Sequence, residues 1–225
     1  MHVRTVVDLS NGLDANTQVY PGDPVPSMSV ASTIERDGFN LLHVTMGSQS
    51  GTHCDAPYHF EADGPRIDEM DLALFAGRAV VVDVIDPAPR HRIEWREIEP
   101  VAERLGPGVI LMLHTGWPRH YGTETYFANP FLDSEACRRI LDRGVRTICI
   151  DAINLDETPD ANHPGDGFPV HHQIAQAGGI IGENFTGLER IDFPDPFVTL
   201  FPLALSGADG APVRAVAMRL EGEGR

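Results

Sequence analysis

The chain of 225 residues is poor in cysteine. Its three cysteines, Cys54, Cys137 and Cys149, are odd in number and form no Cys-x-x-Cys pair. Small domains that depend on disulfides carry more cysteines, usually in even number. We therefore expect no disulfide framework, and we expect a protein of the reducing cytoplasm.

Long hydrophobic runs are also missing. No segment approaches the roughly 20 apolar residues that a membrane-spanning helix needs. Residues 1–8 contain no continuous apolar stretch of the length found in a signal peptide. We expect a soluble protein that has no membrane partner.

Positive charge is scarce. The chain has 17 Lys and Arg against 33 Asp and Glu, which gives a formal net charge of −16. Such a surface repels nucleic-acid phosphates and anionic lipids, so we expect no nucleic-acid partner. Solubility alone is a sufficient explanation of this acidity.

The remaining composition is that of an ordinary globular protein. Apolar residues make up 42% and charged residues 22% of the chain. This length fits one large domain or two small ones, with enough interior for a hydrophobic core. Because no repeat, low-complexity tract or linker interrupts it, we expect a single domain over residues 1–225.

Apolar and β-branched runs alternate with helical patterns, which predicts a mixed α/β fold. Long loops rich in glycine and proline join these elements, and such loops tend to be functional. Ser134 is the predicted N-cap of one of the helices. The predicted strands are 3–9, 40–46, 78–84, 109–114, 145–150, 180–183 and 213–220; the predicted helical segments are 71–75, 97–105 and 135–143.

Four side chains that suit a metal lie within one short segment. Gln49, His53, Asp55 and His59 all fall at odd positions, so in an extended chain they project to one side. A glycine and a proline in the segment disfavour a helix. Imidazole and carboxylate bind zinc or manganese well. The alternative is a histidine-rich surface loop.

Cys54, which lies between two of these candidates, is expected to be a packed residue and not a metal ligand. Cys54 lies between His53 and Asp55, so strand alternation directs it to the opposite face, into the core.

A second pair of candidates lies further along the chain. His171 begins an apparent helix that ends at a Gly-Gly pair, and Glu183 follows on the next predicted strand. The two can face one cavity, and buried glutamates are rare unless they are paired or coordinate a metal. Taken alone, His171 could equally be a surface residue at a helix start.

The segment from Gln49 to His59 reads Q-S-G-T-H-C-D-A-P-Y-H. It resembles the signature H-x-G-T-H-x-D-x-P-x-H of the cyclase superfamily, which includes bacterial kynurenine formamidase and isatin hydrolase. Ordered blocks that resemble the family run through nearly the whole chain, which is far more specific than one motif. These blocks are 8–10, 20–23, 114–117, 150–156 and 170–184.

The resemblance implies roles for the candidates. His53 and Asp55 match ligands of a first metal ion, and Glu183 matches a ligand that can bridge to a second ion held partly by His171. His59 matches the catalytic acid and base. The family uses zinc or manganese, so we expect one or two divalent ions.

The resemblance also implies a fold and an assembly. The family has a swivelling β/β/α domain, in which a mixed sheet or barrel-like core carries helices outside. Its members form homodimers or homotetramers, with substrate pockets near the subunit contacts.

The chain departs from the signature at its first position, where Gln49 replaces a histidine. Its amide oxygen is a harder and usually weaker ligand than imidazole, which should favour manganese or magnesium over zinc. Three possibilities stay open. Gln49 coordinates the ion, it hydrogen-bonds a metal-bound water, or the site is weakened and holds one ion or none.

The predicted chemistry is hydrolysis by metal-activated water. A divalent ion lowers the pKa of bound water from about 15.7 towards about 7, and histidine titrates where it can move the proton. No G-x-S-x-G elbow indicates a serine nucleophile. Aromatic residues of the predicted loops, Tyr20 and Trp117 among them, are candidates for the substrate pocket.

The favoured function is hydrolysis of an amide bond in a small molecule, with N-formylkynurenine as substrate, converted to kynurenine and formate in tryptophan catabolism. One alternative is a ring-opening hydrolase of a cyclic amide, imide or lactone, like isatin hydrolase. The other is a metal-poor, non-catalytic binding protein with the same fold.

Overall fold

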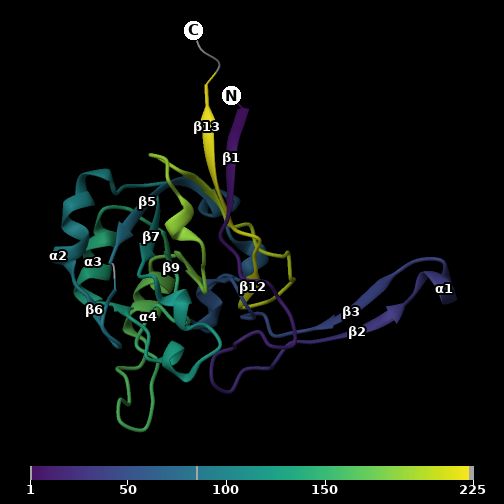
Figure 1. Ribbon diagram of the computed structural model, residues 1–225. Coiled ribbons are helices and arrows are strands. Elements are labelled where there is room, and N and C mark those ends of the chain that lie inside the picture. Colours follow the sequence, from purple (N-terminus) through teal and green to yellow (C-terminus); the bar gives the residue numbers. More distant parts are fainter. Residues whose placement is uncertain (1, 85, 223–225) are drawn as a thin grey trace.

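Nine strands form one mixed sheet in the computed structural model, which describes residues 2–84 and 86–222 (Figure 1). In spatial order, these strands are β1 (His2–Asp8), β13 (Val216–Glu221), β11 (Phe197–Thr199), β5 (Ala76–Asp83), β7 (Ile110–His114), β9 (Thr147–Ile150), β10 (Ile180–Glu183), β4 (His53–Asp55) and β12 (Gly210–Pro212).

The middle of this sheet is parallel and apolar on both faces. β5, β7, β9 and β10 run in one direction. Their side chains alternate between two cores, so that Leu111 and Leu113 enter one cluster and Ile110 and Met112 enter the other. Strands buried on both faces read as continuous apolar runs, which explains why the sequence pattern reveals them clearly.

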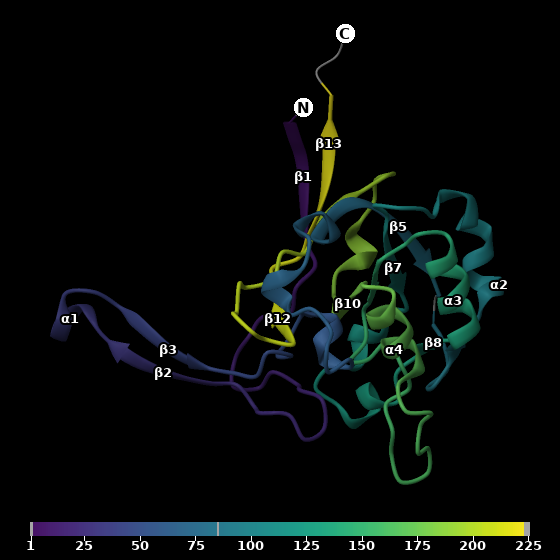
Figure 2. The same cartoon turned by 180° about the vertical axis from the view of Figure 1, so that it is seen from behind.

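Helices cover the first of these cores. α2 (Trp95–Ile98), α3 (Ser134–Asp142) and α4 (Pro169–Gln176) lie on this side of the sheet and contribute buried side chains to the core (Figures 1 and 2). Ile98, Ile140 and Ile174 are the buried anchors of these helices. Each such side chain stabilises the fold by about 1.5–3 kcal/mol relative to an exposed one.

Beyond the parallel strands, the chain reverses direction. β4 pairs antiparallel with β10 on one side and with β12 on the other. This pairing sets His53 opposite Glu183 across the ladder. Residues 130 positions apart in sequence are thereby neighbours on one surface of the sheet.

A hairpin arm, residues 25–46, extends away from the sheet (Figures 1 and 2). It consists of β2 (Ser27–Ser32) and β3 (Leu41–Thr45), which pair only with each other, and a one-turn helix α1 (Ile34–Asp37) at its tip.

The remaining elements are short. β6 (Arg92–Ile93) and β8 (Phe131–Leu132) form a small parallel pair. The 3-10 helices are Pro57–His59, Ile67–Glu69, Leu72–Phe75, Glu99–Arg104, Trp117–His120, Glu124–Phe127 and Leu188–Arg190. Every helix that the structure describes is too short or too polar to cross a membrane.

The predicted strands are present, with shifted ends, but two helix details are wrong. The helix predicted at 97–105 is the short α2 followed by a 3-10 helix, because Pro100 lacks the N–H that would continue α-helical hydrogen bonding. The N-cap of α3 is Asp133, whose carboxylate accepts from the N–H groups of Glu135 and Ala136, and Ser134 is the first helical residue. The sequence pattern also missed β2, β11 and β12.

Candidate metal centre

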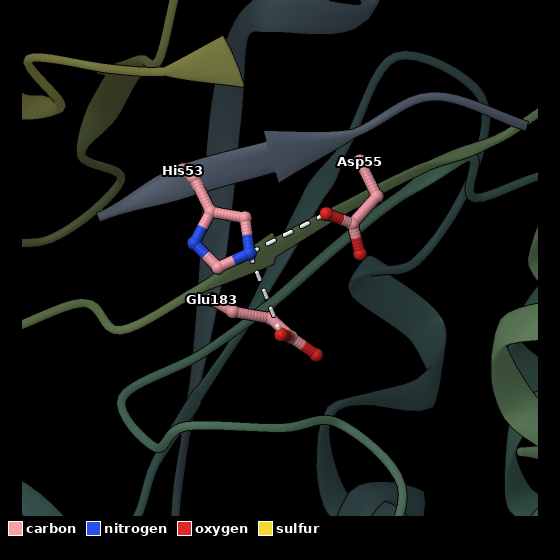
Figure 3. Close-up of side chains that lie close together, drawn as sticks. All are labelled: His53, Asp55 and Glu183. Atoms are coloured by element: carbon pink, nitrogen blue, oxygen red, sulfur yellow. Dashed lines mark ion pairs between the residues drawn. The ribbon is translucent and has the colours of Figure 1, made fainter. Parts of the chain in front are cut away.

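Three side chains with metal-ligand chemistry meet where β4 pairs with β10 (Figure 3). His53 and Asp55 are two residues apart on β4, so they share a face, and Glu183 reaches them from β10. The Nε2 atom of His53 lies 3.4 Å from Asp55 Oδ1 and 3.6 Å from Glu183 Oε2. All three side chains are buried.

The spacing and the bonding of these atoms fit a divalent ion. Ligands about 2.1 Å from a tetrahedral ion are about 3.4 Å apart, close to the separations around His53. Neither oxygen of Asp55 has a hydrogen-bond partner among the described residues, although both are buried. An unpaired buried carboxylate is costly, and a cation between the ligands removes that cost.

His171 approaches the same carboxylates from the other side. It lies in the first turn of α4, and its Nε2 is 3.5 Å from Asp55 Oδ2 and 3.3 Å from Glu183 Oε1. Asp55 and Glu183 thus offer one oxygen towards His53 and one towards His171. These two histidines and two carboxylates would be the groups available to hold a divalent ion.

Hydrogen bonds hold both histidines in the orientation of a ligand. The Nδ1 of His53 donates to the Gly51 carbonyl at 2.8 Å. The Nδ1 of His171 donates to Asp156 at 2.7 Å, and Asp156 also accepts from the His171 backbone N–H at 2.9 Å. Nε2 of each ring is therefore left for a metal, an arrangement common in metal sites.

The titration of these groups reflects the concentrated negative charge. Burial lowers the pKa of His53, but the Asp55 carboxylate, 3.4 Å from its Nε2, outweighs burial and raises the pKa to about 9. Burial raises the pKa of Asp55, but the neighbouring rings of His171 and His53 outweigh burial and lower the pKa. The carboxylates attract protons to both histidines, so binding of a metal ion must release protons.

A cavity of about 210 Å³ opens above this centre. Its aromatic lining suits a small aryl molecule, and its polar lining includes the candidate ligands. The lining residues are Tyr20, Asp23, Gln49, His53, His59, Phe60, Ile153, Asn154, Phe168, His171, Glu183 and Asn184.

His59 stands in the cavity wall, outside the cluster of three ligands. It ends the 3-10 helix Pro57–His59, and its Nδ1 lies 2.9 Å from Asp209 Oδ2. Its ring packs edge-on against Phe60 with 4.8 Å between centroids. The chain bends after Asp55, so His59 reaches the cavity through this turn and not through the strand alternation that the sequence suggested.

Gln49 also reaches the cavity wall. Its Nε2 donates to Asp209 at 2.8 Å, and its buried Oε1 has no hydrogen-bond partner among the described residues.

Residues 7–157 match the sequence profile of the family described as "Putative cyclase". The chain belongs to the cyclase family. Kynurenine formamidase of Bacillus cytotoxicus is 34% identical over 93% of this chain and 95% of that protein. Kynurenine formamidase of Geobacillus thermodenitrificans is 30% identical over 95% of this chain and 97% of that protein.

Solved structures confirm the predicted cyclase fold. Isatin hydrolase A from Labrenzia aggregata, bound to benzyl benzoate, superposes with a TM-score of 0.86, covering 96% of this chain and 94% of that one at 22% identity. An isatin hydrolase bound to the product analogue thioisatinate gives 0.85, with 96% and 92% covered at 21% identity.

The two substrate-binding residues predicted for this cyclase-family chain lie in different surroundings. Tyr20 lines the cavity. Trp117 is buried in the helical core, and its indole N–H donates to the Tyr126 carbonyl at 2.9 Å. The structure gives no support to substrate contact by Trp117, because a loop position in sequence does not reveal whether an aromatic ring faces a cavity or a core.

Sequence reasoning missed several residues of this cyclase-family site, and four of them bear on its chemistry. Asp23, Phe60 and Phe168 line the cavity, and Asp209 binds His59 and Gln49. Asp23 lies inside a block that resembles the family. Asp209 is 150 residues from His59 in sequence, and no local pattern in a single chain signals such a contact.

The ligand cluster predicts that His53→Ala abolishes tight binding of zinc and manganese, while wild type binds both. Because a bound ion stabilises only the folded state, by about 2.7 kcal/mol at 100 times its Kd, a chelator should lower the Tm of wild type alone. Titration calorimetry and thermal melts measure both effects. His163→Ala, which removes an exposed histidine, is the control. Wild type that binds neither ion at millimolar concentration contradicts the assignment.

Proposed function

We propose that this cyclase-family chain is a metal-dependent hydrolase that cleaves the amide bond of N-formylkynurenine, releasing kynurenine and formate. The observation that carries the proposal is the buried Asp55 carboxylate, which has no hydrogen-bond partner among the described residues, beside His53 and Glu183 in the lining of a small aromatic-walled cavity that also contains His59. The kynurenine formamidases that match the chain along nearly its whole length support the choice of substrate.

His53, Asp55, His171 and Glu183 hold the ion in this proposal. Zn²⁺ or Mn²⁺ suits a set of two imidazoles and two carboxylates, as one ion or two. When bound, the ion lowers the pKa of a water molecule and polarises a carbonyl group. Gln49 is a candidate ligand through its free Oε1 and does not belong to the cluster of three around His53.

His59 is the proposed acid and base. It takes a proton from the attacking water and delivers it to the leaving nitrogen. Burial lowers the pKa of His59, but the hydrogen bond to Asp209 and the charge of Asp55 raise it above its ordinary value. A histidine with a raised pKa carries a proton at neutral pH more readily, which favours donation to the leaving group.

The aromatic walls are the proposed substrate contacts. Tyr20, Phe60 and Phe168 come from three separate segments of the chain and line the same cavity as His53 and Glu183. A planar aryl group between them places an attached formyl carbon near the ligands. Small, mostly apolar cavities with a few fixed polar groups are typical of such ligands.

Ring opening of a cyclic amide is the second candidate. The isatin hydrolase structures share this fold with TM-scores of 0.85 and 0.86, and the same water, ion and His59 would serve that reaction. A metal-poor binding protein is disfavoured, because it would leave both oxygens of Asp55 unpaired in the interior.

We propose a cytoplasmic enzyme that works as one domain over residues 1–225. The three cysteines are buried and free, and burial raises the pKa of each thiol. Such thiols are unreactive and suit a reducing compartment. The site draws its residues from Tyr20 to Asp209, so no piece shorter than residues 20–209 contains it.

We propose further that the chain forms a homodimer or homotetramer through its hairpin arm. An isolated two-stranded hairpin is marginally stable, yet this one exposes seven large apolar side chains. These are Val25, Val30, Ile34, Phe39, Leu41, Leu42 and Val44.

The same chain carries a second apolar surface that the arm can cover. Leu72, Phe201, Leu203 and Leu205 are exposed on neighbouring segments, where the Leu200 N–H donates to the Phe75 carbonyl. Exposed apolar patches of this kind mark contacts between proteins. Two copies related by a twofold axis can each place an arm on the other's patch.

The proposed reaction predicts that metal-loaded protein releases kynurenine and formate from N-formylkynurenine with a kcat/KM of at least about 10⁴ M⁻¹s⁻¹. Absorbance of the freed aryl amine measures it. Isatin and simple lactones, assayed in parallel, should be hydrolysed at least tenfold less efficiently. Faster ring opening than deformylation would replace this function by the second candidate.

The proposed role of His59 as acid and base predicts that its substitution lowers the turnover rate without removing the metal. His59→Ala should lower kcat roughly 10²- to 10⁴-fold and leave the metal content nearly unchanged, because His59 lies outside the ligand cluster. His172→Ala is the matched control, since that histidine is on α4 and pairs with Glu61 outside the cavity. If His59→Ala loses metal yet keeps its activity per bound ion, His59 is a ligand.

The proposed assembly predicts that charge on the arm separates the subunits. Phe39→Asp combined with Leu42→Asp should shift the protein to monomer, because two carboxylates would enter an apolar contact. Sedimentation velocity measures the mass. Glu35→Lys, on the same arm, is the control. A wild-type chain that is monomeric at tens of micromolar contradicts the proposal.

A further inference from the structure

Asp209 connects three side chains at the edge of the site. Its Oδ1 accepts from the Ser48 hydroxyl at 2.7 Å, and its Oδ2 accepts from Gln49 Nε2 at 2.8 Å and lies 2.9 Å from His59 Nδ1. Its own backbone carbonyl accepts from the Ala56 N–H at 2.8 Å. Asp209 is therefore anchored directly beside the strand that carries His53 and Asp55.

The chemistry of a carboxylate decides how its neighbours are oriented. An ionised carboxylate only accepts hydrogen bonds, so the proton of His59 that faces Asp209 must be on Nδ1. The other ring nitrogen, Nε2, is then the atom that exchanges protons with the cavity. In the same way, the NH₂ group of Gln49 must face Asp209, which directs Oε1 away from it.

The ionised state of Asp209 is well supported. The hydrogen bond from His59 lowers the pKa of Asp209 most, partial burial opposes it, and Ser48 and Gln49 lower it further. Three polar groups converge on this carboxylate, from Ser48, Gln49 and His59. A carboxylate is ordinarily ionised near neutral pH, so its negative charge stabilises a positively charged His59 ring.

Close packing restricts the orientation of the Gln49 side-chain amide. A Cβ atom at Gly210 would lie 2.6 Å from Gln49 Nε2 and 2.8 Å from its Oε1. The amide is thus held between the backbone of β12 and the carboxylate of Asp209. Its oxygen remains buried in the cavity wall without a partner among the described residues.

We propose that Asp209 is a positioning residue that sets the working orientation of His59 and, with the same carboxylate oxygen, the orientation of Gln49. This rests on the proposed function of His59. Asp209 touches neither substrate nor the ligand cluster. It acts by keeping Nε2 of His59 towards the cavity and by stabilising the charged ring when that ring holds a proton.

The first test is a double-mutant cycle on the full-length, metal-loaded protein. Asp209→Ala should lower kcat roughly 10- to 100-fold, with KM within threefold and metal content unchanged. Asp209→Asn, which keeps the shape and removes the charge, should fall between Ala and wild type. In a His59→Ala background, Asp209→Ala should change kcat by less than twofold, because the residue it positions is gone.

A purely structural role gives a different pattern. It would lower kcat in both backgrounds, and that result overturns the proposal. Asp68→Ala is the matched control, since Asp68 Oδ1 accepts from the Gly207 N–H and anchors the same loop. If Asp68→Ala lowers kcat as far as Asp209→Ala does, loop position and not the carboxylate is responsible, and the proposal is wrong.

A second readout does not depend on hydrolysis. Nitrogen NMR of ¹⁵N-histidine-labelled protein, with His59→Ala to assign the signal, should show the proton of neutral His59 on Nδ1 in wild type. In Asp209→Ala and Asp209→Asn, a mixture of the two tautomers is expected. An unchanged tautomer in both variants overturns the positioning role. Wild type that hydrolyses no tested substrate but shows this tautomer shift would overturn the proposed function and leave the orientation by Asp209 intact.

Discussion

The antiparallel pairing of β4 with β10 is the constraint on which the site depends. It sets His53 opposite Glu183, and a shift of one residue would turn the side chains of β4 to the other face of the sheet. Cys54 and its neighbours in the second core oppose such a shift, because they would have to leave an apolar cluster. The hydrophobic core therefore fixes the register, and the register fixes the distances between the ligands.

Several negatively charged carboxylates lie close together in the protein interior around this pairing. Asp55, Asp156 and Glu183 are all nearly fully buried, and His53 and His171 lie between them. Both histidines contact carboxylates through Nε2, while Nδ1 faces the Gly51 carbonyl in His53 and the Asp156 carboxylate in His171. Buried negative charges on this scale persist only where positive charges accompany them, which explains why His53, Asp55, His171 and Glu183 suit a cation.

Sequence alone predicted the central strands, the family and the residues that meet at the candidate metal centre, for identifiable reasons. The strands are continuous apolar runs, and the Gly51–His59 segment is compact enough to recognise. What the sequence did not reveal depends on contacts between distant residues and on packing. Asp209 meets His59 across 150 residues, and Trp117 is packed in the core although its position in a loop allowed contact with substrate.

One consequence concerns the edge of the sheet beside the site. β12 is the outermost strand there, only three residues long, and it ends in Pro212. A short edge strand with a proline offers few free N–H groups as a template for another chain. The edge of the sheet beside the site is therefore a poor template for strand addition, and the sheet is protected there against edge-to-edge aggregation.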